Sequence, residues 1–275
     1  MKPMDLVAVD QAVGMTDRDR DAMRAAVRAL EHRGFAARLA GLVDKPIELL
    51  GGMLPPGAAT LISTATVRAL EAALKVAVAT LRIGPTVGSV RLNRMLALAS
   101  GAVGGSLGLV SLPVELPIST VIMLRSIADV ARTQGENPDD PETALNCVQV
   151  FGLAGGSASH DVVESRYFAV RALLAQSVNE AARYVAERGL AEQGAPVLVR
   201  FIGQIASRFG VVVTEKLAAQ AVPVLGALGG ATVNVAFVDH FQTIAYGHFT
   251  LRRLERTYGL DLVRNEYERV RREFA

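Results

Sequence analysis

The stretch VESRYFAVRALLAQSVNEAARYVAERG, at residues 163–189, indicates the fold class. Its apolar residues recur every three or four positions, which places them on one side of an α-helix. Polar residues occupy the other side, and Gly189 ends the pattern, as glycine often does just past a helix. The apolar stripe comprises Val163, Tyr167, Val170, Leu174, Val178, Ala181 and Val185. We therefore expect a long amphipathic helix here.

The same period recurs along the rest of the chain, and no segment alternates as a series of strands would. Thr16 and the Asp140-Pro141 pair are typical helix-capping signals. We expect helices over 17–33, 58–83, 118–134, from 141, over 163–188, 195–209, 212–222 and 231–256, and one carrying Val263, Tyr267, Val270 and Phe274. The predicted fold is all-α, a single multi-helix bundle. Residues 1–50 are predicted to form a variable helical arm, and 51–275 the main domain.

Composition excludes several classes of protein. Hydrophobic residues make up 51% of the 275 and charged residues only 20%, which excludes a disordered chain. Lys and Arg number 29 against 27 Asp and Glu, and a net charge of +2 does not favour nucleic-acid binding. The single cysteine, Cys147, excludes an internal disulfide and a Cys-rich zinc site. The first residues lack the apolar segment of a secretory signal, so we expect a cytoplasmic protein.

Two long windows carry no charged residue. They run from Met95 to Val114 and from Leu217 to Val238, close to the roughly 20 residues that cross a bilayer core. Both contain glycines at spacings that allow helices to approach closely. These are Gly101, Gly104, Gly105 and Gly108 in the first window and Gly226, Gly229 and Gly230 in the second. The pattern predicts that the two windows pack against each other.

The windows have two interpretations. One makes them helical hairpins that insert into a membrane or lie on it. The other makes them a buried, glycine- and alanine-lined helix pair in the centre of a bundle. Gln220, Pro223 and Asn234 interrupt the second window, and the chain has no tryptophan for an interfacial belt. These features favour peripheral attachment over stable spanning.

A polar site is predicted where the first window ends. Glu115 lies between two prolines at that end and needs a partner once it is desolvated. On the helix that follows, Arg125, Asp129 and Arg132 share one stripe. One interpretation joins Glu115, Arg125 and Asp129 in a buried functional site. The alternative, which we favour, leaves Glu115 at the positive end of its own helix and pairs Arg125 with Asp129 as neighbours at i and i+4.

A second candidate cluster ends the other window. Its polar residues are Asn234, Asp239, His240 and His248. The two histidines lie about 80° apart around a helix, unlike the i and i+4 pair of an HExxH zinc site. A metal site would need Asp239 or His240 together with Glu115 or Asp129, and no ligand spacing marks one. If the windows pack together, Glu115, Arg125, Asp129 and His240 converge.

Other motifs of catalysis or binding are missing from the sequence. It contains no GxSxG elbow, no Walker A loop and no Rossmann glycine fingerprint. The acidic loop from Glu136 to Glu142 lacks the EF-hand pattern and is interpreted as solvated. The arginine-rich tail alternates with acidic residues, which makes it a weak signal for anionic lipid. Catalytic residues and cofactors are therefore not assigned.

Several segments, in order, resemble the EcsC family of bacterial proteins. They are Leu116–Ala131, Glu164–Arg171, Pro223–Phe241, Gly247–Phe249 and Arg252–Glu255, which together span roughly residues 85–260. The resemblance implies an α-helical protein associated with a membrane, and the family's namesake is encoded beside an ABC transporter. It implies no biochemical activity.

Three functional hypotheses remain. The leading one is a non-enzymatic protein at the inner face of the membrane that contacts lipid or a membrane partner such as an ABC transporter. The second is a metal- or acid/base-dependent hydrolase that uses Glu115, Asp129, Asp239 and His240. The third is a soluble module that binds a hydrophobic small molecule between its helices.

Overall fold

The computed structural model describes residues 14–31, 35, 36, 39, 54–80, 111–155, 166–190, 194–220 and 226–274. Every regular element in these residues is an α-helix, which confirms the predicted all-α class. The helices are α1 (Asp17–Glu31), α3 (Ala58–Thr80), α5 (Leu112–Thr133), α6 (Pro141–Ala154), α7 (Arg166–Arg188), α8 (Pro196–Gln220), α9 (Gly226–Tyr258) and α10 (Leu260–Phe274).

Local signals explain several helix ends. The Asp140 side chain accepts a hydrogen bond of 2.8 Å from the Glu142 backbone amide and caps α6, whose first residue is Pro141. Gly189 follows α7 with a φ of 65°, a left-handed conformation that a side chain would disfavour. These sites confirm the predicted start of α6 and end of α7.

Helices α5, α8 and α9 differ from the sequence prediction, and α9 begins at Gly226 rather than near 231. The segments predicted at 195–209 and 212–222 form one continuous helix, α8. Phe209, Val212 and Val213 are all buried, and their burial outweighs the cost of about 1 kcal/mol for Gly210 within a helix. Helix α5 begins at Leu112 rather than near 118, and it continues through Pro117 because its first turns are held by tertiary packing.

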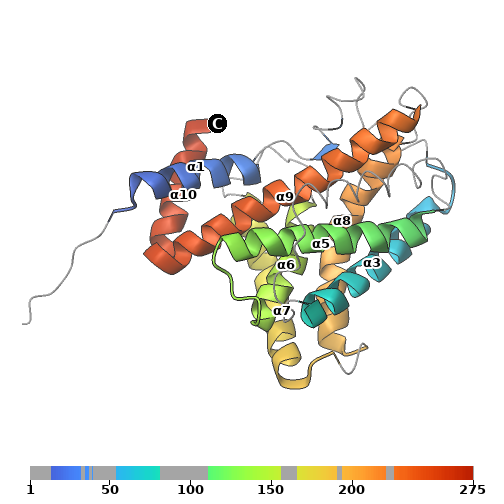
Figure 1. Ribbon diagram of the computed structural model, residues 1–275, viewed down its shortest axis with the longest axis horizontal. Helices are drawn as coiled ribbons and strands as arrows, with labels where there is room; N and C mark the ends of the chain where they lie inside the picture. Colours follow the sequence, from blue (N-terminus) through green and yellow to red (C-terminus); the bar gives the residue numbers. More distant parts are fainter. Residues whose placement is uncertain are drawn as a thin grey trace, which may run out of the picture.

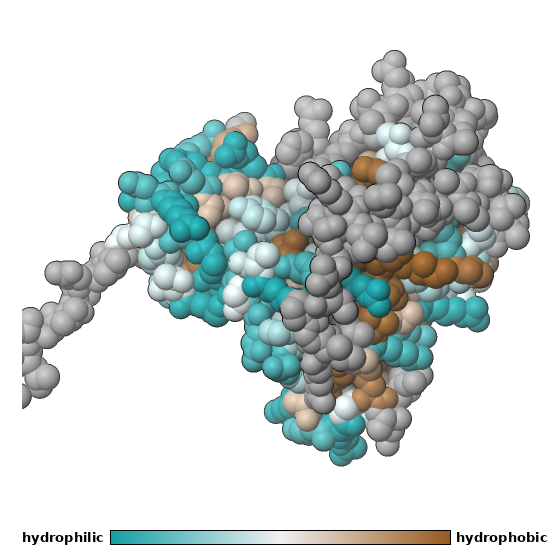
Figure 2. Space-filling view, viewed as in Figure 1, coloured by the Kyte–Doolittle hydropathy of each residue, from teal (hydrophilic) through white to brown (hydrophobic). Residues whose placement is uncertain are grey.

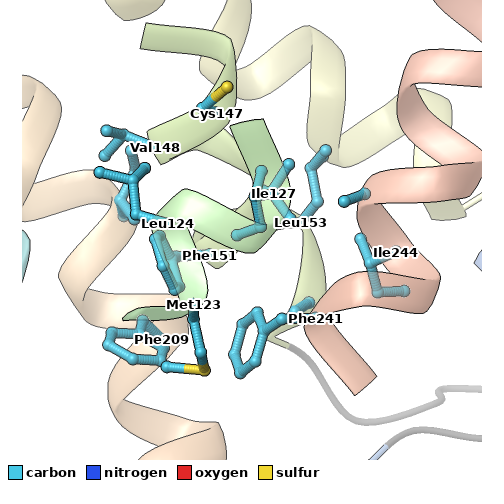
Figure 3. Packing of buried hydrophobic residues seen from close by; sticks show 14 of the residues in the cluster. Met123, Leu124, Ile127, Cys147, Val148, Phe151, Leu153, Phe209, Phe241 and Ile244 are labelled. Atoms are coloured by element: carbon cyan, nitrogen blue, oxygen red, sulfur yellow. The ribbon is translucent and has the colours of Figure 1, made fainter. Parts of the chain in front are cut away.

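The core is built around α6. Every residue of this helix from Thr143 to Ala154 is buried, and it contacts α3, α5, α7, α8 and α9. Phe151 packs at 5.0 Å from Phe209 and 5.2 Å from Phe241, measured between ring centroids (Figure 3). These aromatic contacts join α6, α8 and α9, so the centre of the molecule is apolar and closely packed.

The long helices α5 and α9 extend between two ends of the molecule (Figure 1). Figure 1 shows α1 and α10 crossing near the last turns of α9, whereas the first turns of α3, α5 and α9 lie toward the other end. Helix α1 packs against α9 and α10, and Leu30 approaches Gly247 so closely that a Cβ there would lie 2.6 Å from it. The helix within the predicted N-terminal arm therefore rests on the main domain. The predicted packing of the two glycine-containing windows involves residues 95–110, which lie outside the described residues.

Candidate functional site

Glu115 is joined to a residue that the sequence analysis did not consider. Its carboxylate accepts a hydrogen bond of 2.8 Å from Lys216 Nζ on α8, and the two side chains are only 8% and 3% exposed. The ammonium group of Lys216 also lies 4.8 Å from the centre of the Phe237 ring on α9. This buried ion pair ties the first turns of α5 to the last turns of α8.

The charged stripe of α5 does not form the predicted pair. Asp129 bonds to Arg132 at 2.9 Å, one helical turn further on, whereas Arg125 is exposed and makes no ion pair within the described residues. Partial burial raises the pKa of Asp129, and Arg132 opposes that shift. The expectation that Arg125 and Asp129 pair is therefore wrong, and neither bonds to Glu115 or His240.

His240 is a core residue surrounded by aromatic rings. Its ring lies 5.3 Å from Phe35 and 5.5 Å from Phe241, between ring centres, and its Nε2 lies 3.4 Å from the Ala154 carbonyl oxygen. Asp239 is partly exposed, and Asn234 is fully buried on the same helix. Among the described residues, no group of three His, Cys, Asp or Glu side chains is arranged to hold a metal ion. The described residues therefore provide no third ligand that would let Asp239 and His240 hold a metal ion.

His248 belongs to a separate buried network. Tyr167 Oη lies 2.9 Å from His248 Nδ1, and Arg171 makes two bonds of 2.5 and 2.7 Å to Glu255 beside them. Burial lowers the pKa of His248 well below its usual range and raises the pKa of Tyr167 to about 12, so both are neutral near pH 7. The network joins α7 to α9, and no bond among the described residues links it to Glu115 or His240.

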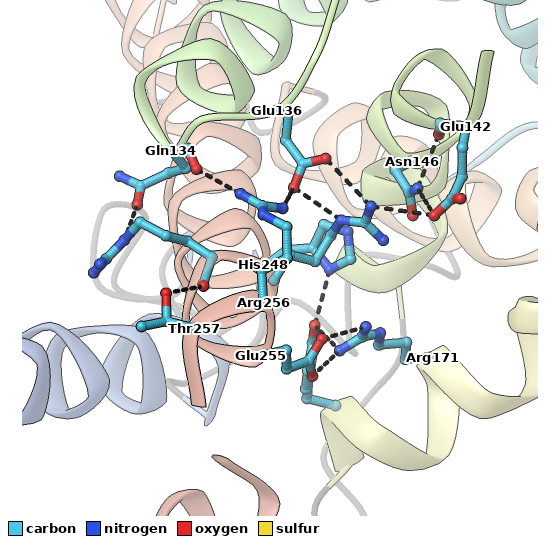
Figure 4. Close-up of polar contacts among 12 residues, drawn as sticks. Gln134, Glu136, Glu142, Asn146, Arg171, His248, Glu255, Arg256 and Thr257 are labelled. Carbon is cyan, nitrogen blue, oxygen red and sulfur yellow. Dashed lines mark hydrogen bonds and ion pairs between the residues drawn. The ribbon is translucent and has the colours of Figure 1, made fainter. Parts of the chain in front are cut away.

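The arginines near the end of α9 are also engaged within the protein. Arg252 bonds to Glu136 at 3.0 Å and to Glu142 at 3.2 Å, and Arg256 pairs with Glu136 as well (Figure 4). Arg253 bonds to Asp19 of α1 at 2.9 Å. Although burial raises the pKa of Glu136, hydrogen bonds from Arg252 and Arg256 more than offset it and hold the pKa below its usual value.

This cluster changes two interpretations of the sequence. Glu136 is only 7% exposed, so the acidic loop is not wholly solvated as expected. Arg252, Arg253 and Arg256 bind carboxylates of the chain rather than standing free for an external anion. The partners are 110 to 234 residues apart in sequence, and no local pattern signals them.

The end of the molecule opposite this cluster of arginines and carboxylates carries almost no charge. We name it the uncharged pole and define it as residues 58–67 of α3, 112–124 of α5 and 226–238 of α9. Glu115 is its only charged residue, and Lys216 neutralises that carboxylate in the interior. Val114 and Ile118 are nevertheless 68% and 52% exposed on α5. In Figure 2, hydrophobic side chains gather along the right-hand half of this helix.

Comparison with protein families identifies the chain's relatives. The model of the EcsC protein family matches residues 86–254. The chain belongs to the EcsC family. No curated protein and no solved structure matches it.

The EcsC match includes the whole Glu115–Lys216 ion pair but only part of the cluster of arginines and carboxylates near the end of α9. It includes Glu115, Lys216 and Phe237, so the ion pair beneath the uncharged pole lies wholly within it. Asp19 and Arg256 lie outside the match, as do α1 and α10. The family segment therefore contains α5 through most of α9, and α1 and α10 both pack against α9.

Proposed function

We propose that this EcsC-family chain is a non-enzymatic protein that attaches peripherally to the inner face of a membrane, and that the uncharged pole is the part that meets the lipid. The observation that carries the proposal is the pair of exposed apolar residues, Val114 and Ile118, on a surface whose described residues carry no exposed charge. Exposed apolar surface of this kind is unfavourable in water and favourable at a lipid interface. The charge-free window 95–114 runs directly into it.

Helix α8 bears on the choice between attachment and spanning. Within the described residues, α8 alone is long and apolar enough to cross a membrane. Its buried side, with Phe201, Ile205 and Phe209, faces the protein core, while its exposed side carries Arg200 and Gln204. This is the pattern of an amphipathic core helix, so α8 gives no support to a transmembrane role.

The hydrolase hypothesis has less support. Three of its four residues occupy separate contacts: Glu115 bonds to Lys216, Asp129 bonds to Arg132, and His240 lies among aromatic rings. A general acid and base need to reach one substrate from a shared cleft. No contact among the described residues brings these side chains together. A membrane protein remains an alternative partner for the same pole.

Flotation with lipid vesicles tests the proposal. Ile118→Asp should weaken binding of the purified protein about thirty-fold, because a charged carboxylate replaces apolar contact worth roughly 2 kcal/mol. Leu173→Asp is the matched control, since Leu173 is 72% exposed but lies on α7, which packs mainly against α6 and α8. Wild-type protein that floats with no vesicle, or equal losses in the two variants, would refute the proposal.

A further inference from the structure

The exposed face of α5 changes character along its length. Val114 and Ile118 lie four residues apart, and Val121 and Ile122 follow Ile118 by three and four residues, so the four share one stripe, which then continues with Arg125 and Asp129. Val114 and Ile118 are exposed, and Val121 and Ile122 are partly exposed. At a rise of about 1.5 Å per residue, the apolar part is about 12 Å long. That is less than half of a bilayer core of about 30 Å.

Helix α3 repeats the change beside α5. The two helices pack against each other and run in the same direction (Figure 1). The exposed residues of α3 before Arg68 are uncharged, and they include Ala59, Thr60, Ser63 and Thr64. Arg68 and Arg125 are therefore the first exposed charges that follow the uncharged pole on these two helices. Neither forms an ion pair or hydrogen bond with another described residue.

We propose that the uncharged pole enters a single leaflet of the membrane as far as Arg68 and Arg125, whose guanidinium groups bind the phosphates of anionic lipids. The inference rests on the proposed function and adds the depth, the lipid class and the residues. Guanidinium groups bind phosphate oxygens through two parallel hydrogen bonds, and an arginine with no carboxylate partner is available for that contact. The buried Glu115–Lys216 pair leaves no exposed charge on the inserted turns of α5.

Lipid composition tests the headgroup contact. We expect the wild type to bind vesicles that contain phosphatidylglycerol more tightly than vesicles of phosphatidylcholine alone. Arg68→Glu and Arg125→Glu should each weaken binding to the anionic vesicles at least five-fold, the factor that corresponds to ~1 kcal/mol per basic residue at such a surface. Arg18→Glu is the control, because Arg18 is also exposed and unpaired within the described residues but lies on α1 at the other end.

The outcomes separate this inference from the proposed function. If the wild type binds no vesicle, the proposed function fails and this inference with it. If Ile118→Asp abolishes binding but both arginine variants bind anionic vesicles as the wild type does, the headgroup contact alone is refuted. A loss of binding in Arg18→Glu equal to that in Arg125→Glu would also refute it, because the effect would then report net charge.

Fluorescent labels at single cysteines test the depth. Cys147 is fully buried, and burial raises the pKa of its thiol to about 12, so it reacts slowly and need not be replaced. Labels at Ile118→Cys should shift to shorter wavelength with anionic vesicles and be quenched by lipids brominated in their chains. Labels at Thr133→Cys, on the exposed far end of α5, should not respond. Equal quenching at both positions would overturn the single-leaflet model. So would a shift in the emission of the label at position 118 when the protein concentration is raised without lipid.

Discussion

The two ends of α9 and α5 differ in how they treat charge. At the charged end, which we define as α1, residues 134–142 and residues 248–258 of α9, three arginines bind carboxylates from two other segments. At the uncharged pole, the same two helices carry one charged residue, and its partner lies in the interior. Both ends contain buried or partly buried ion pairs, but only the charged end presents them in a network.

The polar contacts of the charged end hold the protein together. The surface of the uncharged pole, in contrast, presents few charged groups to a ligand. The arginines of α9 fix α1 and the α5–α6 loop, so they are not free to bind a ligand without loosening the fold. The pole exposes Val114 and Ile118 and satisfies its one carboxylate internally. A charged ligand would find no exposed group of opposite charge among the described residues there, whereas lipid chains require none.

Removing one partner of the buried pair should have the largest effect on stability. Lys216→Met leaves Glu115 buried without its cation, which we expect to cost about 3–5 kcal/mol in the free energy of unfolding. The double variant Glu115→Leu/Lys216→Met should recover most of this loss. Urea unfolding measures both. Arg200→Met is the control, because the Arg200–Glu180 pair is exposed and should cost at most about 1 kcal/mol.

A double-mutant cycle sharpens the same test. Glu115→Gln should couple strongly to Lys216→Met and be additive with Arg125→Met, because Arg125 does not contact Glu115. Coupling of Glu115 to Arg125 or His240, as the sequence predicted, would contradict the geometry described here.

At the charged end, Glu136→Gln should cost about 2–3 kcal/mol at pH 7, the value of charge-assisted hydrogen bonds to Arg252 and Arg256. The folded protein holds the pKa of Glu136 below its ordinary value of about 4.3, so the contribution is present above that pH and is lost as the pH falls through the folded pKa. The test is to measure the free energy of unfolding of the wild type and of the Glu136→Gln variant between pH 3 and pH 7. The two values should approach each other as the pH falls. A constant difference across that range would show that the charge of Glu136 is not responsible.

Glu215, next to Lys216 on α8, should respond with the opposite sign. Burial raises the pKa of Glu215 to about 7, although the Ala36 amide and Arg166 oppose the shift. The folded state therefore favours the protonated acid, and stability falls as the pH rises from about 4.3 towards 7. We expect Glu215→Gln to melt at a higher temperature than the wild type at pH 8 and at a similar temperature at pH 4. Parallel melting profiles of the two proteins would contradict this assignment.

The sequence predicted the helices better than their polar contacts. Periodicity located α7 and the cap of α6 because both depend on residues within a few positions of each other. It divided α8 at Gly210, since a local pattern does not include the tertiary burial that carries the helix through. The need of Glu115 for a partner was visible in its apolar surroundings. The identity of that partner was not, because Lys216 lies 101 residues away.

Arg125 should show the smallest effect on stability of the substitutions considered. It is exposed and has no bonded partner within the described residues, so Arg125→Ala should change the free energy of unfolding by less than about 0.5 kcal/mol. Arg132→Ala should cost more, because it removes the partner of a half-buried carboxylate, Asp129. Chemical denaturation of the two variants under the same conditions makes the comparison. If Arg125→Ala were the more destabilising variant, Arg125 would contribute to the stability of the fold. Its guanidinium group would then not be free to bind a lipid headgroup at the edge of the uncharged pole.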